Sequence, residues 1–368
     1  MSKQKKRIML SITVIAAAIA VCIIYAAAVI SKDAETGNII IKHNLFSDYT
    51  YEICDDHIKL ILYKETNEKT VTIPDTIMGK PVTEIGIYCF STSAPKELMA
   101  YDRKFETVEL GKNVEIIGES AFKGCESLKE VLGDVEISNV GKYAFKGCES
   151  LYKVEFKMSR VENHAFAACV SLHEINMDSR ITYIGSGAFS PCRQLTDIGK
   201  QDNLEYVGDM AFWGAGIEKF EASEDTEFGF SVFLSTPFRD NVSELILNTL
   251  LIKCGYDNKM PYILVQNGIT SMDSGCVCGD ISNLEEIYIS DSVTEIKGYV
   301  CDAKDVKVDF YIPDSVISIG HDYDDGTHVG IDDDAKKIVT TEGSYAQEYA
   351  KKYNIPCEIV DHIEMPEE

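Results

Sequence analysis

The sequence predicts a repeat solenoid rather than one globular core, because a short phrase returns at a nearly constant interval. Its two clearest copies, residues 121–125 and 144–148, both read Ala-Phe-Lys-Gly-Cys. The phenylalanines of the five copies are Phe122, Phe145, Phe166, Phe189 and Phe212. Successive ones are separated by 23, 21, 23 and 23 residues. A period in the twenties is typical of a leucine-rich-repeat solenoid, whose units bury their apolar edges only against their neighbours.

Each repeat divides into an extended stretch, a tight bend and a short turn. In the unit that starts at Val114, the apolar stretch ends at Gly118, a residue type that tolerates a bend. Ala121 and Phe122 then form the turn, in which the phenylalanine fills the interior. Leu128 opens the next strand. We therefore expect the strands of successive units to stack in long parallel sheets.

The phrase Ile-Gly-x-x-Ala-Phe-x-x-Cys-x-x-Leu resembles the BspA-type leucine-rich repeats of bacterial cell-surface proteins. It recurs from about Thr70 to Gly320. Residues 72–86 resemble the opening unit of that family, and residues 343–350 resemble its closing helix. The resemblance implies a surface-displayed module for binding or adhesion.

The chain begins with a basic tail, residues 1–7, and an apolar run without charge, residues 8–30. At about 1.5 Å per residue such a helix spans a bilayer core of about 30 Å. The basic flank stays in the cytoplasm, so we predict a single-pass anchor with the repeats at the cell surface. A cleaved signal peptide is the alternative, because Ala26 and Ala28 fit an A-x-A cleavage site; the protein is then secreted.

The predicted architecture is a β-rich solenoid with short helical turns and a cap at each end. A polar linker, residues 31–38, leads into the solenoid, residues 39–360. Strands over residues 46–53 and 58–63 form an N-terminal β-hairpin cap, which covers the unpaired edge of the first coil.

A helix and a strand are expected to cap the other end of the solenoid. Ser344 can N-cap a helix that runs to about Tyr353. Residues 355–360 then add the last strand, and residues 361–368 form a tail.

The repeat rhythm is interrupted at about residues 222–268. The interruption begins in an acidic stretch, residues 221–227. Further along, the apolar run from Leu245 to Ile252 reads as one buried strand.

The formal net charge of −25, from 35 basic and 60 acidic residues, argues against two classes of partner, nucleic acids and anionic lipids. Nucleic-acid affinity depends on neutralising phosphates, so we expect no nucleic-acid partner. The same charge disfavours docking on anionic lipid headgroups. No metalloprotease, α/β-hydrolase or phosphate-loop motif occurs, so we predict that the protein is not an enzyme and has no catalytic residues.

The 12 cysteines and the acidic loops raise the question of metals and disulfides. Cys125, Cys148, Cys169 and Cys192 each lie three residues after a repeat phenylalanine. This interior position favours buried, reduced thiols over a disulfide ladder. Cys254, Cys276, Cys278 and Cys301 could hold zinc, but they lack the spacing of a paired zinc site, which favours core cysteines. The acidic loop at 321–334 could bind Ca²⁺, but it does not keep an EF-hand register, which favours a solvated loop. We predict no cofactor and no metal site.

Candidate binding residues follow the outer face of the repeat sheet. If the strands of successive units are equivalent, one outward column consists of Glu130, Lys153, Glu174, Asp197 and Lys219. A neighbouring column consists of Glu155, Asn176 and Glu221, with Tyr288 further along. Lys153 lies between two glutamates, so two interpretations are open: cross-strand ion pairing, and a broad recognition surface.

Trp213 is the only tryptophan, and it directly follows a repeat phenylalanine. The other units carry lysine, alanine or serine there, so the position tolerates polar residues. An exposed Trp213 is a candidate interface residue. The alternative is that it packs beneath the phenylalanine-rich segment at residues 228–238.

We therefore predict a membrane-anchored, outward-facing leucine-rich-repeat protein with an adhesion-like function. Its partner is an extracellular or envelope macromolecule, either a protein or a glycan. The alternative is a structural solenoid of the cell envelope that has no specific ligand.

Overall fold

The structure, a computed structural model, describes residues 30–32, 39–41, 48–64, 68–93, 104–177, 180–241, 244–256, 260–301, 306–322 and 327–366. It divides into unit 1, Met1–Tyr183 with Cys192–Ile198, and unit 2, Ile184–Pro191 with Gly199–Glu368. The boundary falls inside strand β17 (Tyr183–Ile184). The predicted anchor lies outside the described residues except for Ile30. Within the described ranges, no helix has both the length and the apolar character to cross a membrane.

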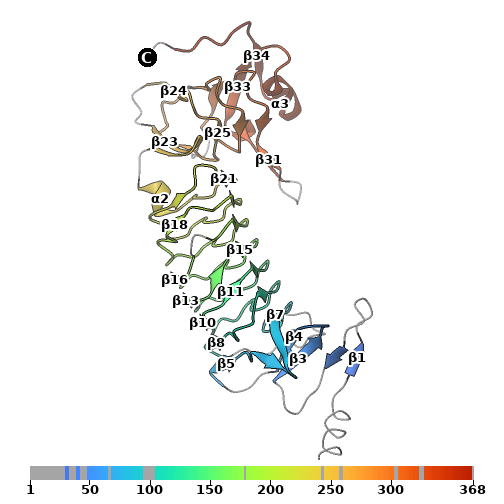
Figure 1. Ribbon diagram of the computed structural model, residues 1–368. Helices are drawn as coiled ribbons and strands as arrows, with labels where there is room; N and C mark the ends of the chain where they lie inside the picture. Colours follow the sequence, from blue (N-terminus) through green and yellow to red (C-terminus); the bar gives the residue numbers. More distant parts are fainter. Residues whose placement is uncertain are drawn as a thin grey trace, which may run out of the picture. The chain divides into compact units, whose positions relative to one another are not determined.

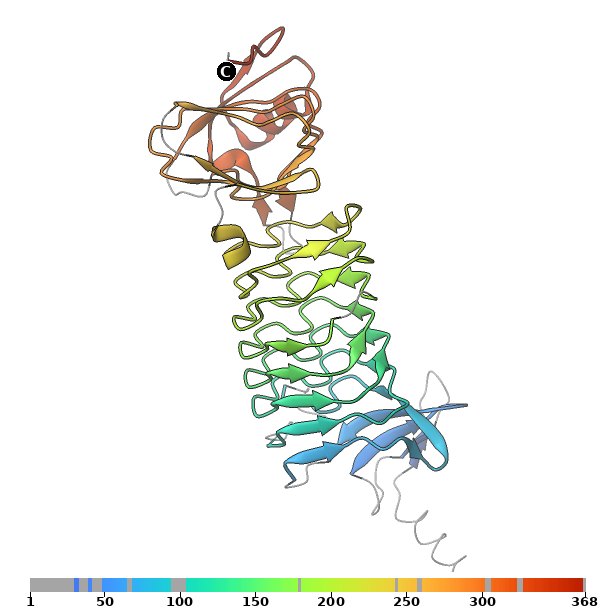
Figure 2. The same cartoon turned by 60° about the vertical axis from the view of Figure 1, so that its left-hand side comes forward.

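Unit 1 is a solenoid in which successive coils add short strands to parallel sheets (Figure 2). One sheet has the order β5 (Thr70–Thr72), β8 (Thr107–Glu109), β10 (Glu130–Leu132), β13 (Lys153–Val154) and β16 (Glu174–Ile175). The parallel strands of a second sheet are β7 (Lys80–Ile85), β9 (Ile116–Ile117), β12 (Asn139–Val140) and β15 (Arg160–Val161). A third pair joins β11 (Glu136–Ile137) and β14 (Lys157–Met158). The predicted repeat architecture is confirmed.

The repeat phenylalanines form the stacked core of the coils. In unit 1 the rings of Phe122 and Phe145 are parallel within 3°, with centroids 4.9 Å apart. Phe145 and Phe166 follow at 5.1 Å, and in unit 2 Phe189 and Phe212 lie 5.5 Å apart. All five side chains are fully buried. Each coil therefore buries its phenylalanine against the next coil, as the period predicts.

Close approach of the coils explains the glycine that ends each apolar stretch. A Cβ atom at Gly141 would lie 2.7 Å from the carbonyl carbon of Gly118, one coil earlier. Any side chain there would force the two coils apart.

A left-handed backbone residue precedes the alanine of the repeat phrase. It is Ser120 in one coil, Tyr143 in the next and His164 in the third, with φ values of 53°, 60° and 56°. The conformation is uncommon for residues other than glycine. It recurs because the same turn is built in every coil.

The N-terminal part of unit 1 contains the predicted hairpin (Figure 1). Strands β3 (Tyr49–Ile53) and β4 (Ile58–Tyr63) are antiparallel, and β4 pairs in parallel with β7. Strand β6 (Thr76–Ile77) pairs with β7. Within the predicted linker, Ser31 and Lys32 belong to β1 (Ile30–Lys32), which pairs with β2 (Ile39–Ile41).

Unit 2 is also built mostly of short strands that pair in parallel. Strand β18 (Lys200–Gln201) pairs with β20 (Glu221–Ala222), and β19 (Tyr206–Val207) pairs with β21 (Glu227–Phe228). One sheet has the order β22 (Glu244–Leu247), β23 (Leu250–Tyr256), β25 (Ser271–Met272), β28 (Glu295–Ile296) and β30 (Ser318–Ile319). The other has the order β24 (Tyr262–Leu264), β27 (Glu286–Tyr288), β29 (Val308–Tyr311), β33 (Ala335–Thr340) and β34 (Cys357–Ile359). The other elements before the C-terminal helix are α2 (Pro237–Asp240), β26 (Val277–Gly279), β31 (His321–Asp322), β32 (His328–Val329) and the 3-10 helix η2 (Ile331–Asp333).

The prediction of one strand from Leu245 to Ile252 is wrong. The segment forms two antiparallel strands, β22 and β23. The chain reverses at Asn248, which has φ 56°. Asparagine tolerates this left-handed conformation, and an apolar run can therefore contain a hairpin turn.

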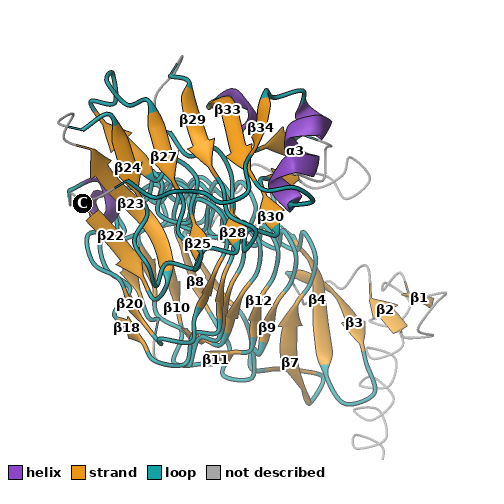
Figure 3. Cartoon of the chain, turned by 90° about the horizontal axis from the view of Figure 1, so that it is seen from above, coloured by secondary structure: helices purple, strands orange, loops and turns teal. Residues whose placement is uncertain are grey.

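The C-terminal helix and strand are present as predicted (Figure 3). Helix α3 (Tyr345–Tyr353) begins after Ser344, whose hydroxyl accepts a hydrogen bond from the Gln347 backbone N–H at 3.1 Å. Strand β34 pairs in parallel with β33. Ala346, Tyr349 and Ala350 are the buried face of the helix.

Candidate functional site

The first predicted column of surface residues is a network of ion pairs and hydrogen bonds. Glu130, Lys153 and Glu174 are aligned on adjacent strands, as predicted. Lys153 Nζ lies 2.8 Å from Glu155 Oε1 and 3.8 Å from Glu174 Oε2. Tyr152 Oη donates to Glu130 Oε1 at 2.5 Å. The hydrogen bond to Glu155 raises the pKa of Lys153, so this face is electrostatically self-compensated.

The two columns do not continue as expected beyond β16. Asn176 Nδ2 donates to the backbone oxygen of Glu155 at 3.2 Å, so these two residues are neighbours. Asp197 and Lys219 are exposed but belong to no strand. Glu221 opens β20 and is paired in register with Lys200. In these repeats the apolar side chains remain buried, but the backbone at Asp197 and Lys219 does not form a β-strand.

Tyr288 packs against its neighbours and projects little surface. It is 7% exposed, and its ring stacks on Tyr311 with centroids 4.0 Å apart. Its hydroxyl donates to Glu286 Oε2 at 3.0 Å. Burial is the main cause of its raised pKa. These contacts give Tyr288 a structural role in unit 2.

Trp213 is exposed at the turn of its repeat. The residue is 44% accessible to solvent, and its backbone N–H donates to Met210 O at 3.1 Å. The alternative in which Trp213 is buried beneath the phenylalanine-rich segment is therefore not observed. An exposed tryptophan agrees with a role in recognition.

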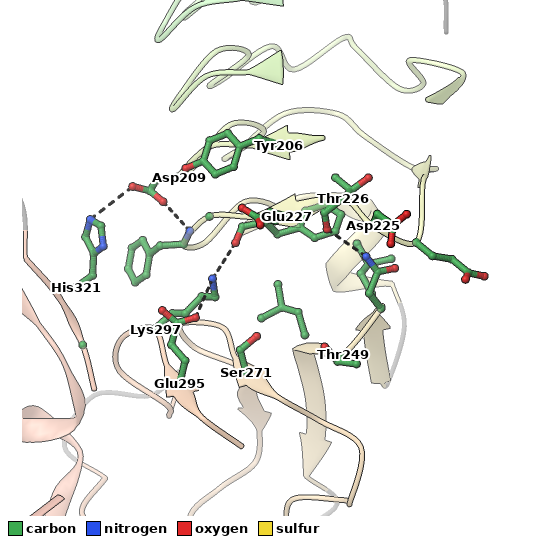
Figure 4. Close-up of a pocket in the computed structure, with 18 residues that line it drawn as sticks. Tyr206, Asp209, Asp225, Thr226, Glu227, Thr249, Ser271, Glu295, Lys297 and His321 are labelled. Carbon is green, nitrogen blue, oxygen red and sulfur yellow. Dashed lines mark hydrogen bonds and ion pairs between the residues drawn. The ribbon is translucent and has the colours of Figure 1, made fainter. Parts of the chain in front are cut away.

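An open pocket of about 510 Å³ lies in unit 2, where the repeat rhythm is lost (Figure 4). Its walls come from residues 206–230, the β22–β23 turn and strands β25, β28 and β31. Lys297 Nζ donates to Phe228 O at 2.8 Å and lies 3.3 Å from Glu295 Oε2. Lys297 therefore links the wall of the pocket to β21.

His321 and Asp209 form a second polar contact across this pocket. His321 Nε2 lies 3.5 Å from Asp209 Oδ2, and the imidazole stacks on Phe230 with centroids 5.2 Å apart. Asp209 Oδ1 accepts a hydrogen bond from the Phe230 backbone N–H at 2.8 Å. Residues distant in sequence thus meet at this pocket (Figure 4).

The rim of the pocket carries carboxylates that no cation compensates. Glu224, Asp225 and Glu227 are exposed, and within the described ranges none of them has a basic side chain at ion-pair distance. Asp225 and Glu227 also line a neighbouring pocket of about 510 Å³, together with Asp202 and Glu205. The resulting local potential is negative and favours a cationic ligand.

No sequence pattern singled out the pocket residues Asp209 and Lys297, and His321 was considered only as part of the loop at residues 321–334. The signal that could have located one wall is the acidic stretch at residues 221–227, which coincides with the loss of repeat rhythm. Nothing in the sequence pairs that wall with β28 or β31, because the contact depends on how later coils stack.

The cysteines of the repeat ladder are buried free thiols. Cys254, Cys276, Cys278 and Cys301 are not disulfide-bonded either. Burial raises the pKa of Cys276 well above its ordinary value, so it stays protonated at neutral pH. In the part of the chain that the structure describes, no cluster of His, Cys, Asp or Glu is arranged to hold a metal ion.

Comparison with known proteins agrees with this architecture. Six copies of the BspA type leucine rich repeat region match residues 92–218 and 244–323, which is more than half of the chain. No curated protein sequence matches. The crystal structure of a leucine rich cell surface protein from Faecalibacterium prausnitzii A2-165 is 18% identical, covers 83% of this chain and 96% of that chain, and has a TM-score of 0.51. The Treponema pallidum leucine rich repeat protein is 25% identical over 53% of this chain and 89% of its own, with a TM-score of 0.44. The chain belongs to the BspA-type leucine-rich-repeat family of bacterial proteins.

Proposed function

We propose that this protein is a non-enzymatic, adhesion-like receptor that binds a protein or a glycan outside the cytoplasm. The apolar run at residues 8–30 tethers it to the membrane, and the repeats face outward. Membership of the repeat family supports a binding role, and the outward orientation is supported by the basic tail at residues 1–7.

The pocket in unit 2 is the observation that carries this proposal. It is polar, open and large enough for a side chain or a sugar ring. Its uncompensated rim, formed by Glu224, Asp225 and Glu227, attracts a cationic group. We therefore assign the pocket to a Lys- or Arg-rich segment of a protein, or to an amino group on a glycan.

The outer sheet face of unit 1 is a weaker candidate for the main binding surface. Lys153 is paired with Glu155 and Glu174, and Glu106 is paired with Lys69 and Lys129. A ligand that binds here must first break such ion pairs, so replacing them gains little binding free energy.

The proposal is tested by binding of the full chain, in detergent micelles, to arrays of matrix proteins and glycans. A pocket variant, Glu224→Gln/Asp225→Asn/Glu227→Gln, removes the rim charge. A matched control, Glu126→Gln/Glu149→Gln/Glu218→Gln, removes three exposed carboxylates outside the pocket. We expect at least one array ligand to bind the wild type and the control and to lose most of its binding to the pocket variant.

Two array results contradict the proposal. Equal losses in both variants would show a dependence on net charge alone. An empty array, together with concentration-dependent self-association of the full chain, would favour the structural solenoid without a specific ligand.

A further inference from the structure

One corner of the unit 1 coils carries a column of aromatic side chains from which one member is missing. Tyr88, Ser120, Tyr143 and His164 occupy the same left-handed turn position in successive coils, with φ values from 53° to 60°. Backbone hydrogen bonds from Ser120 N to Lys142 O (2.9 Å) and from Tyr143 N to Asn163 O (3.1 Å) fix their order. Among these four positions Ser120 is the one that is not aromatic.

The missing ring leaves one face of Tyr143 without an aromatic neighbour. On its other face Tyr143 stacks on His164, with centroids 5.3 Å apart and planes 6° apart. Strand neighbours are spaced by about 4.8 Å, so Tyr88, two coils from Tyr143, is about 10 Å away along the column. In the described part of unit 1 no ring contact joins Tyr88 to Tyr143. A spacing of two coils accommodates one flat ring between the two tyrosines.

Three lysine ammonium groups surround the Tyr143 ring. The Nζ atoms of Lys142, Lys146 and Lys123 lie 5.0, 5.2 and 5.5 Å from its centroid. No carboxylate of the described residues is at ion-pair distance from any of them. In a chain with a net charge of −25 this is an uncompensated cationic cluster. The three ammonium groups repel one another, and an anion placed among them is attracted by all three.

A buried hydroxyl lies at the position of the missing ring. Ser120 is 1% exposed, and its Oγ atom has no hydrogen-bond partner in the described structure. Buried polar atoms are nearly always hydrogen-bonded, so an unpartnered one in the coil next to that of Tyr143 is a further indication of a ligand.

We propose that Tyr143, Ser120 and the three lysines form a subsite for a sugar that carries one sulfate or phosphate ester. The sugar ring lies against the free face of Tyr143, in the place of the missing aromatic ring. The ester oxygens accept hydrogen bonds from the ammonium groups of Lys123, Lys142 and Lys146. Lys142 is exposed and Lys123 and Lys146 are half-buried, and their side chains move aside from the Tyr143 ring to admit the sugar. A sugar presents a broad ring face to Tyr143, which the thin, flexible stem of a phosphorylated side chain lacks. This inference goes beyond the proposed function, because it depends only on residues of unit 1.

The test measures binding of the full chain to four small probes by saturation-transfer NMR and calorimetry. The probes are glucose 6-sulfate, glucose 6-phosphate, unmodified glucose and O-phosphoserine. We expect both sugar esters to bind, and glucose and O-phosphoserine to bind at least about tenfold more weakly, because each lacks one of the two contacts. The difference between the two esters then identifies the preferred oxyanion.

Matched variants separate the subsite from a general charge effect. Lys123→Gln/Lys142→Gln/Lys146→Gln should weaken binding of the esters at least about tenfold. The control Lys69→Gln/Lys129→Gln/Lys157→Gln removes the same charge from lysines that are paired with carboxylates, and should change binding less than about twofold. Ser120→Ala should weaken binding while the thermal midpoint stays at or above the wild-type value.

Three outcomes overturn the inference: neither ester binds, O-phosphoserine binds as well as glucose 6-phosphate, or both lysine variants lose binding equally. The pocket variant of unit 2 should bind the esters like the wild type. Failure of this subsite is therefore distinguishable from failure of the proposed receptor function.

Discussion

The thiol of Cys148 donates a hydrogen bond to the backbone oxygen of Phe122, one coil earlier, at 3.2 Å. Cys169 makes the same contact with Phe145, also at 3.2 Å. Each sulfur fills a fully buried position and supplies a donor to a carbonyl group that faces the next coil. This double role explains why cysteine, and not alanine or valine, recurs three residues after the phenylalanine.

Replacement of a ladder cysteine should destabilise the protein measurably. Cys148→Ala removes the sulfur atom and its hydrogen bond, so we expect a loss of about 1–2 kcal/mol in the free energy of unfolding. Urea denaturation followed by circular dichroism measures it. Cys357→Ala, at an exposed position, is the control and should stay within about 0.5 kcal/mol of the wild type. Equal effects of the two substitutions would contradict the structural role of the ladder.

The ladder thiols should be free but unreactive until the protein unfolds. Burial raises the pKa of Cys148 and of Cys192 well above the ordinary value, so little reactive thiolate forms at pH 8. In native protein we expect a maleimide to modify Cys357 first and the ladder last. In denaturant without reductant, mass spectrometry should find all four ladder cysteines modified. If two neighbouring ladder cysteines stayed unmodified in denaturant, a disulfide between them would be shown instead.

The buried carboxyl of Asp273 should make stability depend on pH between about 4 and 6. Its Oδ1 accepts hydrogen bonds from the backbone N–H groups of Ser231 at 2.7 Å and Ser274 at 2.8 Å. Burial nevertheless raises the pKa of Asp273 to about 6 from its ordinary value of 3.8. The folded state therefore holds its proton more tightly than the unfolded state. This contribution to stability is complete below pH 3.8 and is lost as the pH rises through 6.

Asp273→Asn isolates this effect, because asparagine keeps the acceptor oxygen and cannot ionise. The variant should gain stability relative to the wild type as the pH rises, by about 3 kcal/mol between pH 3.5 and 7.5. Thermal midpoints measured over that range test it. A difference between the two proteins that stays constant with pH would show that Asp273 has an ordinary pKa.

Trp213 offers a direct spectroscopic test, since it is the only tryptophan. At 44% exposure its emission maximum should lie to the red and should shift little on unfolding. Both iodide and neutral acrylamide should quench it in the native protein. A blue-shifted maximum that resists both quenchers would place Trp213 in the core.

The repeat sequence was sufficient to predict which side chains are buried. Phe145 and Cys148 recur at one period, and the fold repeats one local solution, so the period alone gives their environment. The alignment of Glu130, Lys153 and Glu174 followed from the same register. Asn248 shows where this reasoning ends, because a turn inside an apolar run depends on one residue adopting φ above zero.

The pocket could not be predicted, because it depends on a departure from the repeat. His321 approaches Asp209 only because of the way later coils follow the interruption. Periodicity describes what neighbouring coils share and carries no information on contacts that occur once. The missing aromatic member at Ser120 is a similar case. Its significance appears only when Tyr88, Tyr143 and His164 are known to share one corner.

The most direct test of the proposed receptor function is the affinity of the full chain for a hexalysine peptide, measured over a range of salt concentrations. Hexalysine should bind the wild type and the Glu126→Gln/Glu149→Gln/Glu218→Gln control. Added salt should weaken this binding, because it screens the carboxylates of the rim. The Glu224→Gln/Asp225→Asn/Glu227→Gln variant should bind at least about tenfold more weakly, a loss of about 1.4 kcal/mol. No binding at low salt, or the same loss in both variants, would contradict a binding site at this pocket.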